Sequence, residues 1–280
     1  MPGRTARVGK LTTHICYCHG PFRYAWSQRA ELSSSRPVLA AAIAPIMHLV
    51  RRRDRAVSRR VDAYVANSRI TQQRIAAAYH RHSEIIHAPI DVDRFRVAPK
   101  VGDYYLVVSA LVPYKRVDLA IEACNRLREP LLIVGTGPEE SRLKSLAGPT
   151  VKFLGSTADE DVVDLYSRCR ALLFPGLEDY GLTPLEAMAS GRPVIAFGAG
   201  GALDTVADGL TGRFFYRQTS EALIEAINAC ERTLFRPAAI REHAQRFGIP
   251  EFRARFCSFV SQCIEQKRSA SKAASWYVCA

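Results

Sequence analysis

The sequence contains no apolar run long enough for a membrane-spanning helix, which needs roughly 18 consecutive apolar residues. The longest candidate, residues 37–50, is 14 residues long and includes Pro45 and His48, which indicates a buried or surface helix. Residues 1–10 are basic, but no apolar stretch follows them, so we expect no signal peptide.

Cysteines are few and scattered: the 280 residues include eight, with no dense framework. This argues against a disulfide-stapled secreted domain and favours a reducing compartment, where thiols act as small buried apolar groups. We therefore expect a cytoplasmic protein, with peripheral binding at the inner face of the membrane as the alternative.

Acidic residues are scarce in the first third of the chain. Residues 1–100 carry 18 Lys and Arg against 6 Asp and Glu, whereas the other 180 residues carry 21 of each. Two interpretations stay open for the densest basic cluster: the solvated face of a helix, or a patch that meets nucleic acid, anionic lipid or phosphorylated substrates. The cluster consists of Arg51, Arg52, Arg53, Arg55, Arg59 and Arg60.

Short β-rich runs alternate with helical segments along most of the chain, as in a parallel sheet covered by helices on both faces. The predicted strands are 15–18, 62–68, 84–88, 104–109, 130–134, 151–154, 171–174, 193–196 and 214–215. The predicted helices are 36–60, 70–79, 117–127, 139–146, 159–169, 184–189, 221–230 and 250–266, with Ser68 or Asn67 capping the second. Residues 89–102 are polar and loop-like, which is typical of a linker.

These elements predict an α/β protein with one complete and one partial Rossmann-like domain. We expect a partial N-terminal domain at 1–100, a complete domain at 101–248, and a C-terminal helix and tail at 249–280. Ligands of such sheets bind beyond the carboxyl ends of the strands, so the informative residues should directly follow strands.

The richest segment, FPGLEDYGLTPLEAMASGRPV, spans residues 174–194. Thr183 and Glu186 have the spacing of a capping box, which is a purely structural interpretation. Alternatively, the N–H groups around Gly181 form an anion site at a helix N-terminus, flanked by two carboxylates, Glu178 and Glu186, that suit hydroxyl binding. Spacing alone leaves both interpretations open.

Other predicted strands end in similar loops. Lys115 and Arg116 follow one strand, as a diphosphate site needs, and the Gly135–Thr–Gly137 turn follows the next. A third glycine-rich turn, residues 197–201, follows a later strand. Together these loops favour a nucleotide diphosphate ligand more strongly than any one of them does alone.

These segments resemble family 4 of the retaining glycosyltransferases, which has the GT-B fold of two Rossmann-like domains. Within it, the chain is similar to bacterial mannosyltransferases that extend lipid-linked O-antigen or exopolysaccharide. The family's E-x7-E motif matches Glu178 and Glu186. The resemblance rests on YCHGPFRYAW, DAYVANS, IIHAPIDVDRF, VVSALVPYKRVDLAIEA, LLIVGTGPEE, VKFLGS and LFPGLEDYGLTPLEAMASGRPVIAFGAGGALDTV.

The resemblance implies transfer of a hexose, with mannose favoured, from a nucleotide diphosphate sugar to a glycan or polyprenyl-diphosphate-linked acceptor, with retention. Lys115 would stabilise the leaving diphosphate without a metal ion or other cofactor. Glu178 would hold the donor sugar, Glu186 the ribose, and the N–H groups of Gly181 and Leu182 the phosphates. Further donor contacts would come from Ser109, Arg116, Gly135, Gly137, Leu154, Tyr180 and Thr183.

Two features depart from the family pattern. Ala110 occupies the position of a usual arginine in the first phosphate loop, and Arg116 beside Lys115 is a candidate substitute. The N-terminal strand and glycine-rich loop of the family are not found before Lys10, so we expect an N-terminally truncated chain. A catalytically impaired nucleotide-sugar-binding fragment is therefore the alternative function.

The segment THICYCHG, residues 13–20, places four metal-ligand types within six positions. A zinc site usually draws ligand pairs from two separated segments, and no second pair of this kind stands elsewhere in the sequence. A metal site and a redox pair are both weaker interpretations than the one the resemblance implies. It makes His19 a catalytic residue that faces the donor sugar, with Arg23 and Tyr24 on the acceptor side.

Two further features have plain interpretations. Asp91-Val-Asp93 looks like a metal motif but matches the family's interdomain stretch, so we interpret it as structural. Nucleic-acid binding is suggested by charge alone, whereas the predicted nucleotide loops lie in the neutral part of the chain. We therefore expect the arginine cluster to meet an anionic membrane and expect no nucleic-acid partner.

Overall fold

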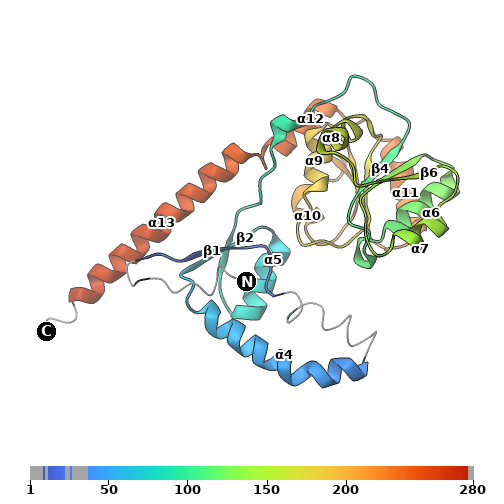
Figure 1. The fold of residues 1–280 in the computed structure, drawn as a ribbon. Coiled ribbons are helices and arrows are strands. Elements are labelled where there is room, and N and C mark those ends of the chain that lie inside the picture. Colours follow the sequence, from blue (N-terminus) through green and yellow to red (C-terminus); the bar gives the residue numbers. More distant parts are fainter. Residues whose placement is uncertain (1–8, 10–11, 23–25, 27–36, 277–280) are drawn as a thin grey trace. The chain divides into compact units, whose positions relative to one another are not determined.

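The computed structural model describes residues 9, 12–22, 26 and 37–276. It divides the chain into two compact units, one made of Met1–His87 with Phe252–Ala280 and the other of Ala88–Glu251. The α/β class expected from the sequence is confirmed, because both units contain a parallel sheet with helices packed against it (Figure 1).

The first unit has a three-stranded parallel sheet in the order β1-β2-β3. Strand β1 (Ile15–Cys18) is followed by helix α4 (Pro37–Ser58), β2 (Ala63–Ala66) by α5 (Arg69–Tyr79), and β3 (Ser83–Ile85) completes the sheet. Helix α13 (Ile249–Trp276) supplies the C-terminal part of the unit.

The two faces of β1 differ as strand alternation requires. Cys18 is buried in a cluster with Tyr64 and Tyr79, and Cys16 packs against the same cluster. Tyr17 points to the other face, where its ring meets Phe252 and Phe256 of α13 edge-on at 5.8 and 6.1 Å. The cysteines are therefore core residues of one face, as predicted.

Helix α5 begins where the sequence predicts. Ser68 is the N-cap, and its hydroxyl accepts a hydrogen bond from the Thr71 N–H at 3.2 Å. The helix ends at His80, which has a left-handed conformation (φ 54°) and donates its N–H to the Ala76 carbonyl at 2.9 Å.

The second unit is a six-stranded parallel sheet in the order β6-β5-β4-β7-β8-β9. Its strands are β4 (Tyr105–Val108), β5 (Leu131–Val134), β6 (Val151–Gly155), β7 (Leu172–Phe174), β8 (Val194–Phe197) and β9 (Gly212–Phe215). Its α-helices are α6 (Val117–Leu127), α7 (Glu140–Leu146), α8 (Asp159–Arg168), α9 (Thr183–Ala189), α10 (Ala202–Thr205), α11 (Ser220–Glu231) and α12 (Pro237–Gln245). Two 3₁₀ turns, η1 (Val92–Arg94) and η2 (Pro113–Lys115), complete the unit.

Each face of this sheet has its own core. Alternate strand residues such as Leu106 and Leu172 pack against helices α8, α9 and α12, while Val107 and Leu173 pack against α6, α7 and α11. The central strands β4, β5, β7 and β8 are buried along most of their length, which explains why they read as apolar runs in the sequence.

The strand order reverses between β4 and β7. From β4 the chain moves outward through β5 and β6, and from β7 it moves outward the other way through β8 and β9. The loops after β4 and β7 therefore diverge at a topological switch point, the place where open α/β sheets bind their ligands.

The structure differs from the predicted organisation in the segment 89–102. We expected a linker, but Val92 and Phe95 are buried in the core of the second unit with Phe247. Arg241 of α12 ties the segment down by donating to the carbonyls of Phe95 (2.8 Å) and Val92 (3.2 Å). The Asp91–Val–Asp93 stretch is thus part of a packed 3₁₀ turn.

The C-terminal region also differs from the prediction. Helix α12 has few apolar residues, chiefly Ile240 and Ala244, and the sequence analysis missed it. Helix α13 extends to Trp276, beyond the predicted end at residue 266. Its part from Phe252 onward groups with the first unit, because the two phenylalanines pack against Tyr17.

Candidate functional site

The carboxyl edge of the second sheet brings the predicted loops together. The loop after β4 and the loop after β5 are joined by backbone hydrogen bonds: Leu111 donates to Thr136, and Glu139 donates to Leu111, at 2.9 and 3.0 Å. Gly135 has φ +121°, and a Cβ there would lie 2.0 Å from the Ser109 carbonyl oxygen. Only glycine allows this close contact.

The loops after β7 and β8 are joined in the same manner. Gly201 donates its N–H to the Glu178 carbonyl at 2.8 Å, and a Cβ at Gly201 would lie 2.3 Å from the Tyr180 Cα. The glycine-rich loop of residues 197–201 therefore packs directly against the backbone of the loop that carries Glu178.

Lys115 and Glu178 connect the two sides of the switch point. The Lys115 ammonium donates to the Glu178 carboxylate, and the two side chains keep only 16% and 20% of their exposure. Lys115 ends the 3₁₀ turn after β4, and Glu178 lies in the loop after β7. A cation and a carboxylate thus stand together at the position where this topology binds ligands.

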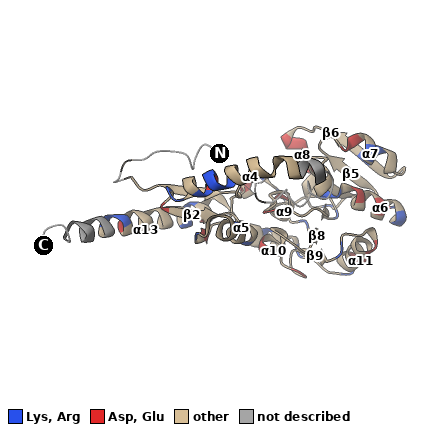
Figure 2. Cartoon of the chain, turned by 90° about the horizontal axis from the view of Figure 1, so that it is seen from below, with Lys and Arg blue, Asp and Glu red and all other residues tan. Residues whose placement is uncertain are grey.

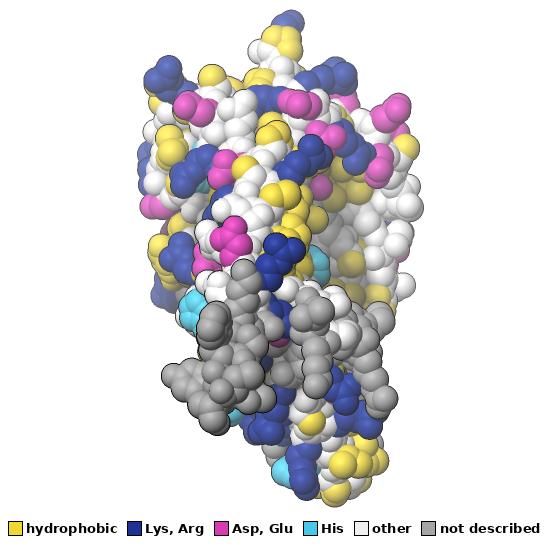
Figure 3. Space-filling view, turned by 90° about the vertical axis from the view of Figure 1, so that its left-hand side faces the viewer, with side chains coloured by type: hydrophobic (Ala, Val, Ile, Leu, Met, Phe, Trp, Pro, Cys, Tyr) yellow, Lys and Arg dark blue, Asp and Glu magenta, His cyan; other side chains and the backbone are white. Residues whose placement is uncertain are grey.

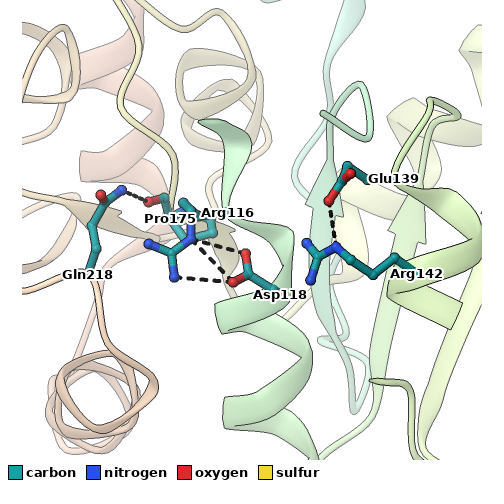
Figure 4. A network of polar contacts seen from close by, with 6 residues as sticks. All are labelled: Arg116, Asp118, Glu139, Arg142, Pro175 and Gln218. Carbon is teal, nitrogen blue, oxygen red and sulfur yellow. Dashed lines mark hydrogen bonds and ion pairs between the residues drawn. The ribbon is translucent and has the colours of Figure 1, made fainter. Parts of the chain in front are cut away.

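The neighbouring cation is engaged elsewhere. Arg116 forms a bidentate pair with Asp118 of α6: its Nε donates to Oδ1 at 3.2 Å and its Nη2 donates to Oδ2 at 3.1 Å (Figure 4). Figure 4 also shows Gln218 donating to the Pro175 carbonyl at 3.0 Å, which joins the segment after β9 to the loop after β7. The Arg116 guanidinium is therefore paired, and its role as a substitute for an arginine expected at position 110 stays a prediction.

Glu186 is held by a tyrosine from another helix. It lies in the first turn of α9, and its Oε2 accepts a hydrogen bond from the Tyr166 hydroxyl of α8 at 2.8 Å. Burial raises the pKa of Glu186, although the hydrogen bond from Tyr166 and the charge of Arg94 act in the opposite direction. The capping box expected from Thr183 and Glu186 is not formed: α9 begins at Thr183, with no side-chain cap at Leu182.

The strand order and the charged loops at its switch point agree with a known protein family. A model of the family described as "Glycosyl transferases group 1" matches residues 91–247, more than half of the chain. The chain belongs to the group 1 glycosyltransferases.

Two curated relatives of this chain are mannosyltransferases. The chain is 33% identical over 226 residues to the GDP-mannose-dependent monoacylated alpha-(1-6)-phosphatidylinositol monomannoside mannosyltransferase of Corynebacterium glutamicum, covering 68% of this chain and 59% of that protein. It is 34% identical over 137 residues to O-antigen chain mannosyltransferase C of Escherichia coli, covering 46% of this chain and 37% of that protein. The chain thus spans only part of the length of these curated relatives.

Solved structures share the fold of this glycosyltransferase. The HepE protein of Anabaena, in complex with UDP and glucose, superposes with a TM-score of 0.66 at 24% identity, over 76% of this chain and 66% of that one. The sucrose-phosphate synthase of Thermosynechococcus elongatus gives a TM-score of 0.71 at 21% identity, covering 90% of this chain and 68% of that one. The GT-B-type fold expected from the sequence is confirmed by these likenesses.

The remaining predicted donor contacts of this glycosyltransferase differ in exposure. Tyr180 is buried, and its hydroxyl donates to the Ala88 carbonyl at 2.8 Å, so its side chain has a structural contact. Gly181 has φ +87°, and within the described residues the N–H groups of Gly181 and Leu182 donate no hydrogen bond. Leu154 lies in the edge strand β6 and is exposed.

His19 belongs to the first unit of the glycosyltransferase, directly after β1. Its ring is exposed and lies edge-on to Tyr17 at 5.2 Å, and its Nδ1 is 3.4 Å from the Asn67 side-chain nitrogen. A role toward the donor sugar stays a prediction. Arg23 and Tyr24, expected on the acceptor side, lie outside the described residues.

Among the residues described, no group of three or more His, Cys, Asp or Glu side chains is placed to hold a metal ion.

None of the described helices combines the length and apolar character needed to cross a bilayer.

Two side chains near Glu186 were missed by the sequence analysis. Tyr166 contacts Glu186 from a helix 20 residues earlier, and Arg94 reaches the same region while pairing with Asp159 at 2.9 Å. No local motif marks either residue, because both contacts depend on how η1, α8 and α9 pack.

Proposed function

We propose that this glycosyltransferase moves a hexose, with mannose favoured, from a nucleotide diphosphate sugar to a glycan or polyprenyl-diphosphate-linked acceptor, with retention of configuration. The observation that carries the proposal is the Lys115–Glu178 ion pair at the switch point. The GDP-mannose dependence named for the Corynebacterium and Mycolicibacterium smegmatis relatives supports the choice of sugar.

The proposed roles follow from the chemistry of each side chain. The Lys115 ammonium turns from Glu178 to the diphosphate and offsets the charge that develops as the bond to the sugar breaks. Glu178, released from the lysine, accepts hydrogen bonds from hydroxyls of the donor sugar. Glu186 accepts from the ribose, and the N–H groups of Gly181 and Leu182 meet the phosphates.

The proposal includes a reaction without a metal ion or other cofactor. A cation fixed beside the diphosphate can supply the charge that a divalent ion supplies in other transferases. His19, Arg23 and Tyr24 are proposed to face the sugar and the acceptor. Donor turnover that persists in excess chelator would support this reaction, and full loss that magnesium restores would contradict it.

The test of the donor site is calorimetric titration with GDP-mannose, UDP-glucose, GDP and UDP, beside a Glu186→Ala control. Binding of one nucleotide, lost in the control, is the expected result and identifies the base. No binding by any of them, from a sample with a cooperative melting transition, would contradict the proposed function. Binding without sugar transfer to any lipid-linked acceptor would favour the alternative of an impaired nucleotide-sugar-binding protein.

We further propose that α4 brings the enzyme to the cytoplasmic face of an anionic membrane. Positions 42, 45, 46, 49, 52, 53 and 56 are exposed and repeat every three or four residues, so they share one face of the helix. Ile46 and Leu49 are 60% and 67% exposed, and Arg52 and Arg53 follow on the same face. Figure 2 shows basic residues grouped in one part of α4, and Figure 3 shows basic and hydrophobic side chains together at the bottom of the view.

Vesicle sedimentation at physiological salt tests this surface. We expect binding to phosphatidylglycerol vesicles and little to neutral phosphatidylcholine, since roughly 1 kcal/mol is gained per basic residue near an anionic surface. The Arg52→Glu/Arg53→Glu variant should lose this binding, whereas Arg126→Glu, a change of exposed charge in the second unit, should keep it. Equal sedimentation with both vesicle types would overturn the proposal.

A further inference from the structure

Tyr166 has a contact that the proposed mechanism does not use. Its side chain is fully buried in α8, with 0% exposure, and its ring packs edge-on against Phe95 at 6.0 Å. The only polar atom of this side chain, the hydroxyl, is directed at Glu186 Oε2 at 2.8 Å. A buried phenol needs a hydrogen-bond acceptor, and a backbone carbonyl would satisfy that need. Here the acceptor is instead the carboxylate of Glu186, a predicted ligand-binding residue.

The hydrogen bond fixes one carboxylate oxygen and leaves the other available. Within the described residues, Glu186 Oε1 accepts no hydrogen bond, and the side chain is half-buried at the carboxyl edge of the sheet. A glutamate side chain has three rotatable bonds, so an unanchored carboxylate would lose conformational entropy on meeting a ligand. Anchoring through Oε2 removes part of that cost before the ligand arrives.

We propose that Tyr166 is a positioning residue that orients the Glu186 carboxylate to accept from the ribose hydroxyls of the nucleotide. The inference rests on the proposed assignment of Glu186 to the ribose. Burial raises the pKa of Tyr166 well above its usual value, so the phenol stays protonated and can donate a hydrogen bond at neutral pH.

The chain contains a matched control for a purely structural role. Tyr105 is also fully buried, and its hydroxyl donates to the Glu231 carboxylate at 2.6 Å. Tyr105 begins β4 and Glu231 ends α11, so this pair lies away from the carboxyl edge of the sheet. Tyr105→Phe and Tyr166→Phe therefore remove the same kind of hydrogen bond, but only the second removes one at the candidate site.

The experiment compares GDP with 2′-deoxy-GDP, and UDP with 2′-deoxy-UDP, by calorimetry. Wild type is expected to prefer the ribonucleotide by about tenfold, as for a hydrogen bond to a charged group. Tyr166→Phe should reduce this preference several-fold while the affinity for the deoxynucleotide stays nearly constant. Tyr105→Phe should lower the melting temperature but keep the preference, and 4-aminophenylalanine at position 166, which retains a donor, should restore it.

The outcomes distinguish a failure of the Tyr166 inference from a failure of the Glu186 assignment in the proposed function. If Tyr166→Phe keeps the full preference while Glu186→Gln abolishes it, Tyr166 does not position the carboxylate, and the inference is overturned. If Glu186→Gln also keeps the preference, the assignment of Glu186 in the proposed function is wrong. Should Tyr166→Phe fail to fold, 4-fluorophenylalanine at position 166 fills more of the space without donating and gives the same test.

Discussion

Lys115 and Glu178 form an ion pair across the point where the strand order of the second sheet reverses, although 63 positions separate them in the sequence. Neither side chain keeps more than 20% of its exposure. Removing one partner therefore leaves a partly desolvated charge, which is unlike the loss of a surface pair.

Lys115→Ala and Glu178→Ala should each lower sugar transfer by on the order of a hundredfold, because each removes a group that we propose to contact the reacting donor. In unfolding experiments the two changes should be non-additive, with a coupling free energy of about 1 kcal/mol. Urea denaturation of both single variants and the double variant measures this coupling. Strict additivity would show that the pair does not exist in solution.

Gly201→Ala should disturb the donor site from a distance. The added Cβ would lie 2.3 Å from the Tyr180 Cα, so the loop carrying Glu178 must shift. We expect about tenfold weaker nucleotide binding, since one hydrogen bond to a charged group is worth roughly that factor. Gly155→Ala is the control: its φ of +67° carries only the left-handed penalty, about 1 kcal/mol, with no atom within 4 Å of the new Cβ. Equal loss of binding in both variants would contradict the explanation.

Ala110→Arg should strengthen binding of nucleoside diphosphates by about tenfold, equivalent to one charge-assisted hydrogen bond. Ala110 is exposed in the loop after β4, and the Arg116 guanidinium is paired with Asp118. Titrations at two salt concentrations, with Ala110→Gln as a neutral control of similar length, measure the effect. A gain of the same size in Ala110→Gln would show that charge is not its cause.

Glu186→Gln should stabilise the ligand-free protein at neutral pH while it weakens nucleotide binding. Burial raises the pKa of Glu186 above its value in the unfolded chain, so the folded state holds the proton more tightly and loses stability as pH rises through the folded pKa. The groups that face it are Tyr166, Arg94 and Asp159, and glutamine still accepts from the tyrosine.

The measurement is the difference in melting temperature between the two proteins as a function of pH. We expect a gain on the order of 2 °C at pH 7. The gain should vanish below about pH 4, where the glutamate is protonated in both states. A gain that is independent of pH would mean that the carboxylate charge is not its source.

Local patterns predicted the elements whose signals are local. The short apolar runs between helical segments predicted all six strands of the second sheet, with ends within a few residues of those observed. Ser68 caps α5 as expected. Helix α12 was missed because it is only 9 residues long and its buried residues, Ile240 and Ala244, are too few to mark a helix in the sequence. The segment after residue 88 read as a linker because its three buried apolar residues, Ile90, Val92 and Phe95, are few and join a core formed by residues far away in the sequence.

The candidate site was predictable only in part, for the same reason. Three site residues can be recognised from their place in the strand and helix pattern. Lys115 and Glu178 follow strands, and Glu186 lies in the first turn of a helix. Arg116 is a candidate substitute for the missing arginine because charge can be read from sequence, whereas its pairing with Asp118 is visible only in the structure. Tyr166 carries no motif at all, since its partner lies on another helix.

The reversal of strand order has a consequence for how this protein becomes able to bind. Strands β4 to β6 supply Lys115, and strands β7 to β9 supply Glu178, so a chain with only one set of strands assembled holds half of the charged pair. If the pair binds the nucleotide as proposed, a domain with one set of strands unassembled has only half of that site. Nucleotide binding would then stabilise the fully folded domain relative to partly folded forms.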